Sequence, residues 1–390
     1  MYFFLDDFVA LSMRGASSSS RLRDQVAIKK QVRRSILGDS ECEVHLRPSR
    51  GRCVLAKVSL SPGVVIKLLS GPPYAACLLR SNHLRCEHCF GDVQRYGTEH
   101  AQPVAASCPR GCSAVYCSDL CRGEDFRYWG HEMALTAAPG ASALRAHAVK
   151  SESLGAESDP ESLDRFGALL LAVRCLWRHH GSGSTQHNAR PQLPSSLSSV
   201  EFNREEEEEH ILFERLAHGP SVADMDDLAQ LAAEVPGYLP PGVSASRVVT
   251  MIGCLRANYA SFTDEVGTII GAGCYTRQSQ INHSCAPNCV LSFGPRGRVN
   301  VRTARPISAG EELVTTYIDL SMEWRLRQET LWQRYGFECD CIRCMRDGDG
   351  DAIGYRQRDE EDINALLEAA QQAQAREREM PWRLLEESAR

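Results

Sequence analysis

The apolar positions of two segments repeat with the period of an α-helix. Residues 165–178 carry bulky apolar side chains at helical spacing, namely Phe166, Leu169, Leu170, Val173, Leu176 and Trp177. A second segment, 360–379, gathers Ile363, Leu366, Leu367 and Ala370 on one side, and Pro381 follows at a position that ends helices. The pattern therefore predicts an amphipathic helix at each of these two places.

Short continuous apolar runs predict strands elsewhere. VVIKLL at 64–69 follows the turn residues Ser61-Pro62-Gly63 and has the composition of a buried strand. VNVRT at 299–303 and ELVTTYI at 312–318 also have the composition of strands, and a turn around Pro306–Gly310 joins them. The chain from 246 to about 345 is therefore expected to be globular.

Two polar stretches interrupt these patterns. Residues 179–200 are rich in His, Gly, Ser and Pro, which predicts a mobile linker. The acidic run Glu205–Glu209 either begins a helix or is simply solvated. No repeat of fixed period is present, and no run of eighteen apolar residues predicts a membrane span.

Composition and charge bring the cysteines forward. The chain has 17 cysteines, 43% hydrophobic residues and a net charge of −6, so it is not an obvious polyanion binder. Its apolar N-terminus lacks a positive flank, and Asp6 and Asp7 interrupt it, which argues against a signal peptide. We therefore expect the cytoplasm or the nucleus, where cysteines serve as metal ligands rather than disulfides. The basic stretch 28–34 is either a nuclear address or a solvated helix face.

The cysteines fall into two clusters with metal-ligand spacing. The first holds Cys86-x2-Cys89, Cys108-x3-Cys112, Cys117-x3-Cys121 and His131 within 46 residues. The second, Cys339-x-Cys341-x2-Cys344, has three thiols, whereas a structural zinc takes four ligands. Cys285, in the stretch QSQINHSCAPNCV, is the natural fourth ligand. This hypothesis clamps residues 339–344 to the segment that contains Asn282 and His283.

Several motifs resemble those of a known family. Asn282-His283-Ser284-Cys285-x-Pro287-Asn288, Gly310-Glu311-Glu312-Leu313 with Tyr317 four residues later, and Tyr335-Gly336-Phe337-x-Cys339-x-Cys341-x2-Cys344 resemble a SET domain and its post-SET zinc segment. The cluster at 86–131 resembles a MYND zinc finger. Over about 43–345, the chain is similar to the SET-and-MYND (SMYD) protein-lysine methyltransferases, in their shorter branch without a long C-terminal helical-repeat domain.

The resemblance implies an α+β fold in which a MYND-type finger and a helical insertion split a mostly-β SET core. The expected organisation places a poorly ordered extension at 1–42 and the first part of the SET domain at 43–85. The finger follows at 86–135, the helical insertion at 136–245, the SET core at 246–320, the post-SET segment at 321–345 and a short helical tail at 346–390.

The resemblance also implies S-adenosylmethionine as methyl donor, a lysine amine as acceptor and two or three zinc ions. Tyr317 matches the catalytic tyrosine. The implied cofactor contacts are Gly51, Arg52, Asn258, Asn282, His283, Tyr317 and Phe337, and the implied substrate channel contains Tyr275, Tyr335 and Phe337. Transfer is an in-line displacement in which positioning and electrostatics carry the catalysis. Aromatic walls hold the lysine, and desolvation lowers the pKa of its amine.

The implied zinc ligands form three groups, of which one is incomplete. Cys86, Cys89, Cys117 and Cys121 make the first site, and Cys285, Cys339, Cys341 and Cys344 make the post-SET site. Cys108, Cys112 and His131 supply only three ligands to the second finger site, because Leu135 stands where the family has a cysteine. The chain also departs from the family at Cys53, where a second glycine of the first cofactor loop is usual.

Two functions of different class follow from these features. The first is an active methyltransferase of histone or non-histone lysines, which the intact motif around His283 and Tyr317 favours. The second is a catalytically weakened scaffold that binds proline-containing peptides through its finger, which Cys53 and Leu135 favour. Taken alone, His283 would be a satisfied buried histidine, and Tyr275 is expected to be structural rather than catalytic. We expect a monomer with a lysine-containing protein or peptide as substrate, and no membrane or nucleic-acid partner is indicated.

Overall fold

The computed structural model describes residues 41–47, 51–78, 85–93, 106–107, 114–129, 165–181, 199–219, 225–235, 237–264, 267–348 and 356–379. Cys108, Cys112, His131 and Leu135 lie outside the described residues, as do 1–40, 182–198 and Pro381. None of the described helices is long and apolar enough to cross a membrane.

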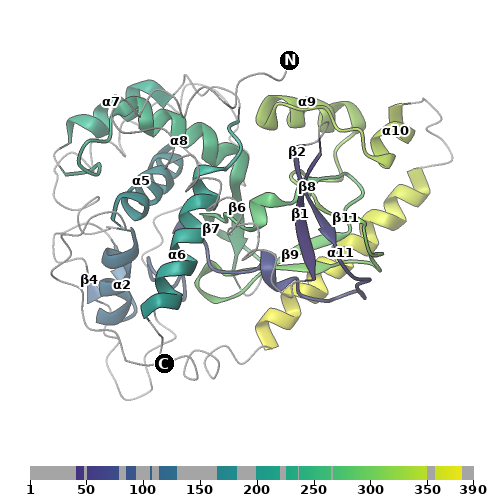
Figure 1. Ribbon diagram of the computed structural model, residues 1–390, viewed down its shortest axis with the longest axis horizontal. Coiled ribbons are helices and arrows are strands. Elements are labelled where there is room, and N and C mark those ends of the chain that lie inside the picture. The colour runs from purple at the N-terminus through teal and green to yellow at the C-terminus, as the bar shows by residue number, and fades with distance from the viewer. Residues whose placement is uncertain are drawn as a thin grey trace, which may run out of the picture.

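A four-stranded sheet joins the two ends of the SET-like region (Figure 1). Its order is β1 (Cys42–Arg47), β2 (Gly51–Ala56), β11 (Glu312–Thr315) and β8 (Asn282–His283). β11 runs parallel to β8 and antiparallel to β2, so residues from three distant parts of the sequence meet in one sheet. Apolar side chains of this sheet form a core with Ile66, Leu69 and Ile281.

Three smaller sheets complete the β structure of the described residues. One has the order β3 (Ala75–Leu78), β7 (Ile269–Cys274) and β6 (Tyr259–Thr263), and another pairs β9 (Cys289–Phe293) with β10 (Val299–Thr303). In the finger, β4 (Ala106–Ser107) pairs with β5 (Val115–Tyr116). Gly271 permits the close approach of β7 to its neighbour, since an added Cβ would lie 2.1 Å from the Phe262 ring.

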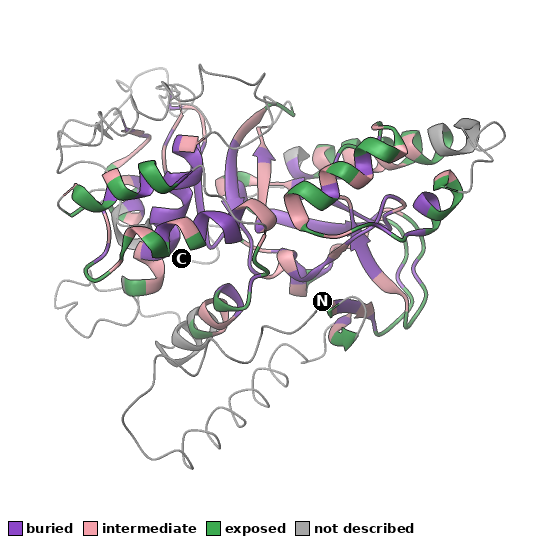
Figure 2. Cartoon of the chain, turned by 90° about the horizontal axis from the view of Figure 1, so that it is seen from above, coloured by how far each residue is buried: buried purple, intermediate pink, exposed green. Residues whose placement is uncertain are grey.

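The helices gather on two sides of these sheets (Figure 1). α5 (Arg165–Gly181), α6 (Ser199–Glu214), α7 (Asp226–Glu234) and α8 (Ala245–Asn258) share an apolar core with β3 and β7. α2 (Asp119–Trp129) belongs to the finger, and α9 (Trp324–Tyr335) and α10 (Ile342–Gly348) form the post-SET region. Figure 2 shows the buried residues concentrated on the strands and on the inner faces of these helices.

The C-terminal helix α11 (Arg356–Glu379) docks on the β9–β10 pair through polar contacts. Glu377, with 1% of its side chain exposed, forms an ion pair of 2.5 Å with the buried Arg302. The amide of Gln374 accepts from the Phe293 N–H at 2.9 Å and donates to the Phe293 carbonyl at 2.8 Å. The helix thus caps the free edge of β9 as a paired strand would.

The α+β fold predicted from the sequence is confirmed, as are the helix at 165–178, the strand at 299–303 and the final helix. The strand expected at 312–318 ends at Thr315, where the chain turns away from the sheet. The strand predicted at 64–69 is wrong. Within this segment Val65 forms an isolated bridge with Arg302 of β10, and 67–69 is a short 3-10 helix, because the chain leaves the extended conformation after this brief contact with β10.

The two polar stretches noted in the sequence end inside helices. His179 and His180 belong to α5, and the acidic run Glu205–Glu209 lies within α6. The expected linker therefore overlaps the end of one helix and the start of the next.

Candidate functional site

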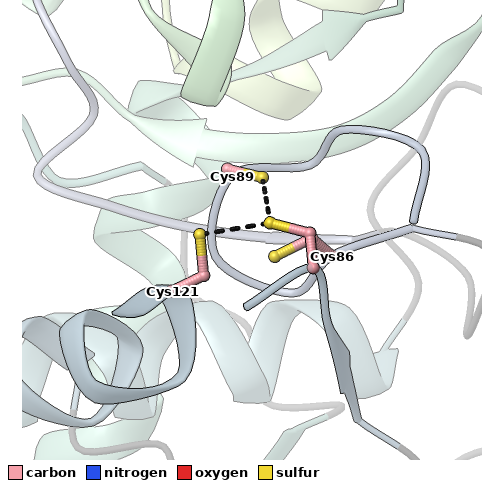
Figure 3. Close-up of side chains that lie close together, drawn as sticks. Cys86, Cys89 and Cys121 are labelled. Atoms are coloured by element: carbon pink, nitrogen blue, oxygen red, sulfur yellow. Dashed lines mark hydrogen bonds between the residues drawn. The ribbon is translucent and has the colours of Figure 1, made fainter. Parts of the chain in front are cut away.

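Four cysteines of the finger converge on one point. The sulfur atoms of Cys86, Cys89, Cys117 and Cys121 all lie within 4.8 Å of one another, and Cys117 is 3.6 Å from Cys89 and 3.4 Å from Cys121. Figure 3 shows Cys86, Cys89 and Cys121 pointing toward each other. Four thiolates around a zinc ion with Zn–S bonds of about 2.3 Å would lie about 3.8 Å apart, so this set fits a structural zinc.

A tight turn and a helix start hold this arrangement. Cys86 and Cys89 begin and end a short turn, and Phe90, directly after it, has a positive φ of 61° and donates its N–H back to the Cys86 carbonyl at 2.9 Å. Cys121 lies in the first turn of α2, where the Ser118 hydroxyl accepts its N–H at 3.1 Å. The three predicted ligands of the second finger site lie outside the described residues, so that site stays a prediction.

The post-SET cysteines converge in the same way, and Cys285 completes them. The sulfur atoms of Cys285, Cys339, Cys341 and Cys344 lie within 4.8 Å of one another, all four residues are buried, and Cys285 is 3.5 Å from Cys344. The four sulfur atoms therefore converge as the predicted metal clamp between 339–344 and the segment at 282–285 requires. Four thiolates with one Zn²⁺ would leave a net charge of about −2.

A buried cation faces this negative charge. Arg327 on α9 has 1% of its side chain exposed, lies 4.0 Å from the Cys344 sulfur and pairs with Asp347. Gln328, the next residue, holds Cys339 through two bonds of 2.8 Å to its backbone N–H and carbonyl. Neither residue was predicted from the sequence, because nothing in the local pattern of α9 shows which side chains face the cysteines.

Asn288, the last residue of the motif that contains Cys285, is fully buried, and its side chain hydrogen-bonds the motif to β11. Its Oδ1 accepts the Val314 N–H at 2.9 Å, and its Nδ2 donates to the Glu312 carbonyl at 2.8 Å and to Glu311 Oε1 at 3.1 Å. All the hydrogen-bonding capacity of this amide except one lone pair is used. These three hydrogen bonds explain why position 288 holds an asparagine rather than a smaller turn residue.

Asn282, at the start of β8, bonds to the segment matched to the first cofactor loop. Its Nδ2 donates to the Arg52 carbonyl at 2.8 Å and to Glu312 Oε1 at 2.9 Å. Gly51 has a φ of +67°, and among the described residues a Cβ added there would meet no atom within 4 Å, so the described part of the loop leaves space beside the Gly51 backbone. Cys53, the departure from the family, is fully buried and its β2 neighbours form core contacts.

The guanidinium of Arg52 lies half-buried beside the catalytic candidate Tyr317. It donates to the carbonyl of Arg215 just after α6, and burial followed by the neighbouring Arg215 lowers the pKa of Arg52. A half-buried cation next to a second cation favours an anionic ligand, because such a ligand would offset the cost of desolvating the guanidinium.

Tyr317 stands at the centre of an aromatic cluster. Its ring centroid is 5.3 Å from that of His283 and 5.0 Å from that of Tyr335, and Phe337 lies 6.0 Å from His283. The Tyr317 hydroxyl donates to the Ile281 carbonyl, and the Tyr335 hydroxyl donates to the Tyr317 carbonyl at 3.1 Å. Burial, more than the nearby Tyr335 and Glu312, raises the pKa of Tyr317, so its side chain is a neutral phenol near pH 7.

The structure brings Tyr317, Tyr335, Phe337, Asn282 and His283 together, as the sequence predicted. Tyr275 makes a different set of contacts. It is buried, its hydroxyl donates to the Gly297 carbonyl at 2.5 Å, and its ring packs against Phe293. Asn258 ends α8, and its amide donates to the carbonyls of Ala217 and Cys254 at 2.7 Å each. Roles for these two residues in ligand binding stay predictions.

Glu209, from the acidic run, is a further residue whose role the sequence did not show. Its carboxylate accepts from the Thr276 hydroxyl and pairs with Arg277 at 2.5 Å. These contacts tie α6 to the turn that precedes Asn282 by five residues. The run was visible in the sequence, but only the fold shows that one of its members faces this turn.

The comparisons with known proteins agree with this geometry. A family model described as "SET domain" matches residues 51–318. N-lysine methyltransferase SMYD2 of Gallus gallus is 26% identical over 311 residues, which cover 79% of this chain and 61% of that protein. Histone-lysine N-methyltransferase SMYD3 of Mus musculus is 45% identical over 86 residues, which cover 22% of this chain and 20% of that protein.

A yeast relative matches a shorter stretch. Histone-lysine N-methyltransferase set5 of Schizosaccharomyces pombe is 42% identical over 73 residues, covering 18% of this chain and 23% of that protein. The matched parts thus span between a fifth and about three fifths of these curated relatives. The resemblance to SET-and-MYND methyltransferases predicted from the motifs is confirmed by these matches.

Proposed function

The chain belongs to the SET-domain family, and from this premise we propose that it is a protein-lysine N-methyltransferase that uses S-adenosylmethionine. The observation that carries the proposal is the placement of Tyr317. Its backbone and hydroxyl are both hydrogen-bonded, and it lies between the strand that carries Asn282 and His283 and the aromatic side chains of Tyr335 and Phe337. The substrate class is a lysine-containing protein or peptide, histone or non-histone.

The residues proposed to hold the cofactor lie around the same point. The open backbone at Gly51, the half-buried guanidinium of Arg52 and the ring of Phe337 offer space, a positive charge and an apolar face. Asn258 and Asn282 complete the proposed set together with the backbone, rather than the ring, of His283. When bound, the cofactor supplies a methyl group on a positively charged sulfur, which an uncharged amine can attack.

Tyr317 acts in this proposal as a neutral dipole rather than as a base. Because burial raises the pKa of its hydroxyl, forming a phenolate would be costly, and the hydroxyl instead orients the lysine nitrogen. The apolar faces of Tyr335 and Phe337 favour the uncharged amine, since desolvation lowers the pKa of an ammonium group. These faces also tolerate the methylated product through cation–π attraction.

Zinc has a structural role in this proposal. Both groups of four cysteines are assigned one zinc ion each, and a third ion at Cys108, Cys112 and His131 stays a prediction. The post-SET group holds the segment with Phe337 against the strand with His283, so its metal would shape the site without touching the reacting atoms. The alternative of a catalytically weakened scaffold that binds peptides through the finger rests on Cys53 and Leu135, and the methyltransferases that the chain resembles do not favour it.

Methyl transfer from labelled S-adenosylmethionine to a panel of histones and lysine peptides tests the proposal, with cofactor binding measured by calorimetry. Tyr317→Phe should lower turnover by about 10- to 100-fold and leave the cofactor Kd within about twofold, because the hydroxyl acts on the amine. Tyr238→Phe, at a buried tyrosine near α7, is the matched control and should keep full turnover. Cofactor binding without transfer to any lysine substrate would refute the activity, and full turnover of Tyr317→Phe would remove Tyr317 from the catalytic role.

A further inference from the structure

The backbone of Tyr317 is positioned by side chains rather than by a sheet. β11 ends at Thr315, so the Tyr317 N–H has no strand partner. It donates instead to Nδ1 of His283 at 3.0 Å, while the carbonyl of the same residue accepts from the Tyr335 hydroxyl at 3.1 Å. The imidazole therefore replaces the hydrogen bond that the ladder would have supplied.

This contact fixes where the proton of the ring lies. A backbone N–H can only donate, so Nδ1 of His283 must be the acceptor, and a neutral ring then carries its proton on Nε2. Nε2 lies 3.3 Å from the sulfur of Cys285, within reach of an N–H···S hydrogen bond. A cysteine that binds a metal is a thiolate, which accepts such a bond well.

We propose that His283 is a positioning residue that links the Cys285 thiolate to the backbone of Tyr317. The inference rests on the proposed function, since it assigns His283 a role in placing the tyrosine that the reaction uses. His283 has 6% of its surface exposed and both its ring nitrogens are engaged, so its side chain has no polar atom left for a ligand. His283 thus couples the four-cysteine site to Tyr317 instead of contacting the cofactor through its ring.

Two amide substitutions separate the two bonds. In His283→Asn, the amide oxygen lies near the former Nδ1 and accepts from Tyr317, but the side chain is too short to reach Cys285. In His283→Gln, the longer amide reaches Cys285 and loses the acceptor for Tyr317. His45→Gln, at an exposed histidine on β1, is the matched control. Turnover, cofactor Kd and the rate of zinc release to a colorimetric chelator are measured for all three variants and for the unchanged protein.

The two bonds predict opposite patterns. His283→Gln should lower kcat by about tenfold, the loss expected for one hydrogen bond, and should release zinc at the unchanged rate. His283→Asn should keep kcat within about threefold and release zinc about fivefold faster, because the thiolate loses its donor. The cofactor Kd should stay within about twofold in both. Identical behaviour of the two variants, or a Kd increase as large as the kcat loss, would overturn the inference.

A spectroscopic measurement on the unchanged protein does not depend on turnover or on the folding of a variant. Long-range ¹H–¹⁵N correlation spectra of protein labelled at histidine report the protonated nitrogen of each ring. His283 should show the proton on Nε2 in the zinc-loaded protein, and a proton on Nδ1 would overturn the inference. If no lysine substrate is methylated while this pattern and the zinc-release difference appear, the proposed function fails and the link to Cys285 stands.

Discussion

Changing Asn288 to aspartate tests the hydrogen bonds that join the cysteine-containing motif to β11. The two side chains have the same shape, but aspartate replaces the Nδ2 donor by an oxygen. Two acceptors, the Glu312 carbonyl at 2.8 Å and Glu311 Oε1 at 3.1 Å, would then face a carboxylate with no donor between them. The third bond, from the Val314 N–H, would remain.

The expected cost follows from these contacts. Leaving a buried partner without its hydrogen bond costs about 1–3 kcal/mol, so two losses cost about 2–6 kcal/mol. The Glu311 side chain is 29% exposed and can turn to water, so its share lies at the low end. A carboxylate in a site with 0% exposure adds a desolvation cost. We expect the free energy of unfolding to fall by about 4 kcal/mol at pH 7.

The loss of stability in the aspartate variant should depend on pH. Burial and the neighbouring Glu311 should raise the pKa of the introduced carboxyl in the folded protein, so the folded state binds its proton more tightly than the unfolded state. The variant is therefore destabilised by the full amount at pH values above the raised pKa of the folded state. The destabilisation shrinks as the pH falls toward the pKa of this carboxyl in the unfolded state, about 4. The protonated carboxyl also recovers one donor.

Urea unfolding of the zinc-loaded protein at pH 7 and pH 5, followed by tryptophan fluorescence, measures both effects. Asn288→Ala is the uncharged control: it loses the same two bonds and the Val314 bond as well, and its cost should not change with pH. If the cost of the aspartate variant is the same at both pH values, or is under about 1 kcal/mol at pH 7, these buried hydrogen bonds are not the reason for the asparagine.

Cys285→Ser should remove one zinc from the protein, which metal counting on the purified variant checks; full metal content would contradict a shared four-thiolate site. Glu377→Gln should lower the free energy of unfolding by about 3–5 kcal/mol, because Arg302 stays buried without its counter-charge. Urea titration measures this loss, and a cost under about 1 kcal/mol would show that the pair is exposed in solution. Burial, followed by the neighbouring His179, lowers the pKa of His210 to about 4 in the folded protein. The stability that the neutral His210 ring contributes is therefore fully present above its pKa in the unfolded chain, about 6.5, and is lost as the pH falls toward 4. Thermal melts between pH 4 and 7 should show this slope, and His210→Gln should flatten it; equal slopes in the two proteins would contradict the assignment.

Local sequence patterns determined the parts of this protein that depend on neighbours along the chain. The apolar spacing of 165–178 gave a helix because a buried stripe needs only its own periodicity. The finger cysteines at 86–89 and 117–121 predicted a metal site because each pair supplies half a tetrahedron within one short turn or helix start.

Patterns in the sequence failed where pairing over long distances decides. Residues 64–69 have the composition of a strand, yet they cross the core and form a 3-10 turn, since β-structure requires a partner that this segment meets only at Val65. The strand expected at 312–318 likewise stops at Thr315, where β8 and the motif around His283 end their pairing with it.

The candidate site shows the same division. The sequence by itself supplied its residue types, namely Tyr317, His283 and a fourth thiol at Cys285, because their motifs are local. Only the tertiary structure decided that the His283 ring joins the Tyr317 N–H to the Cys285 sulfur. It also decided that Arg327 faces the cysteines, and that one glutamate of an acidic run, Glu209, faces the turn at Thr276. Such contacts depend on which faces of distant elements meet, and no periodicity along the chain records that.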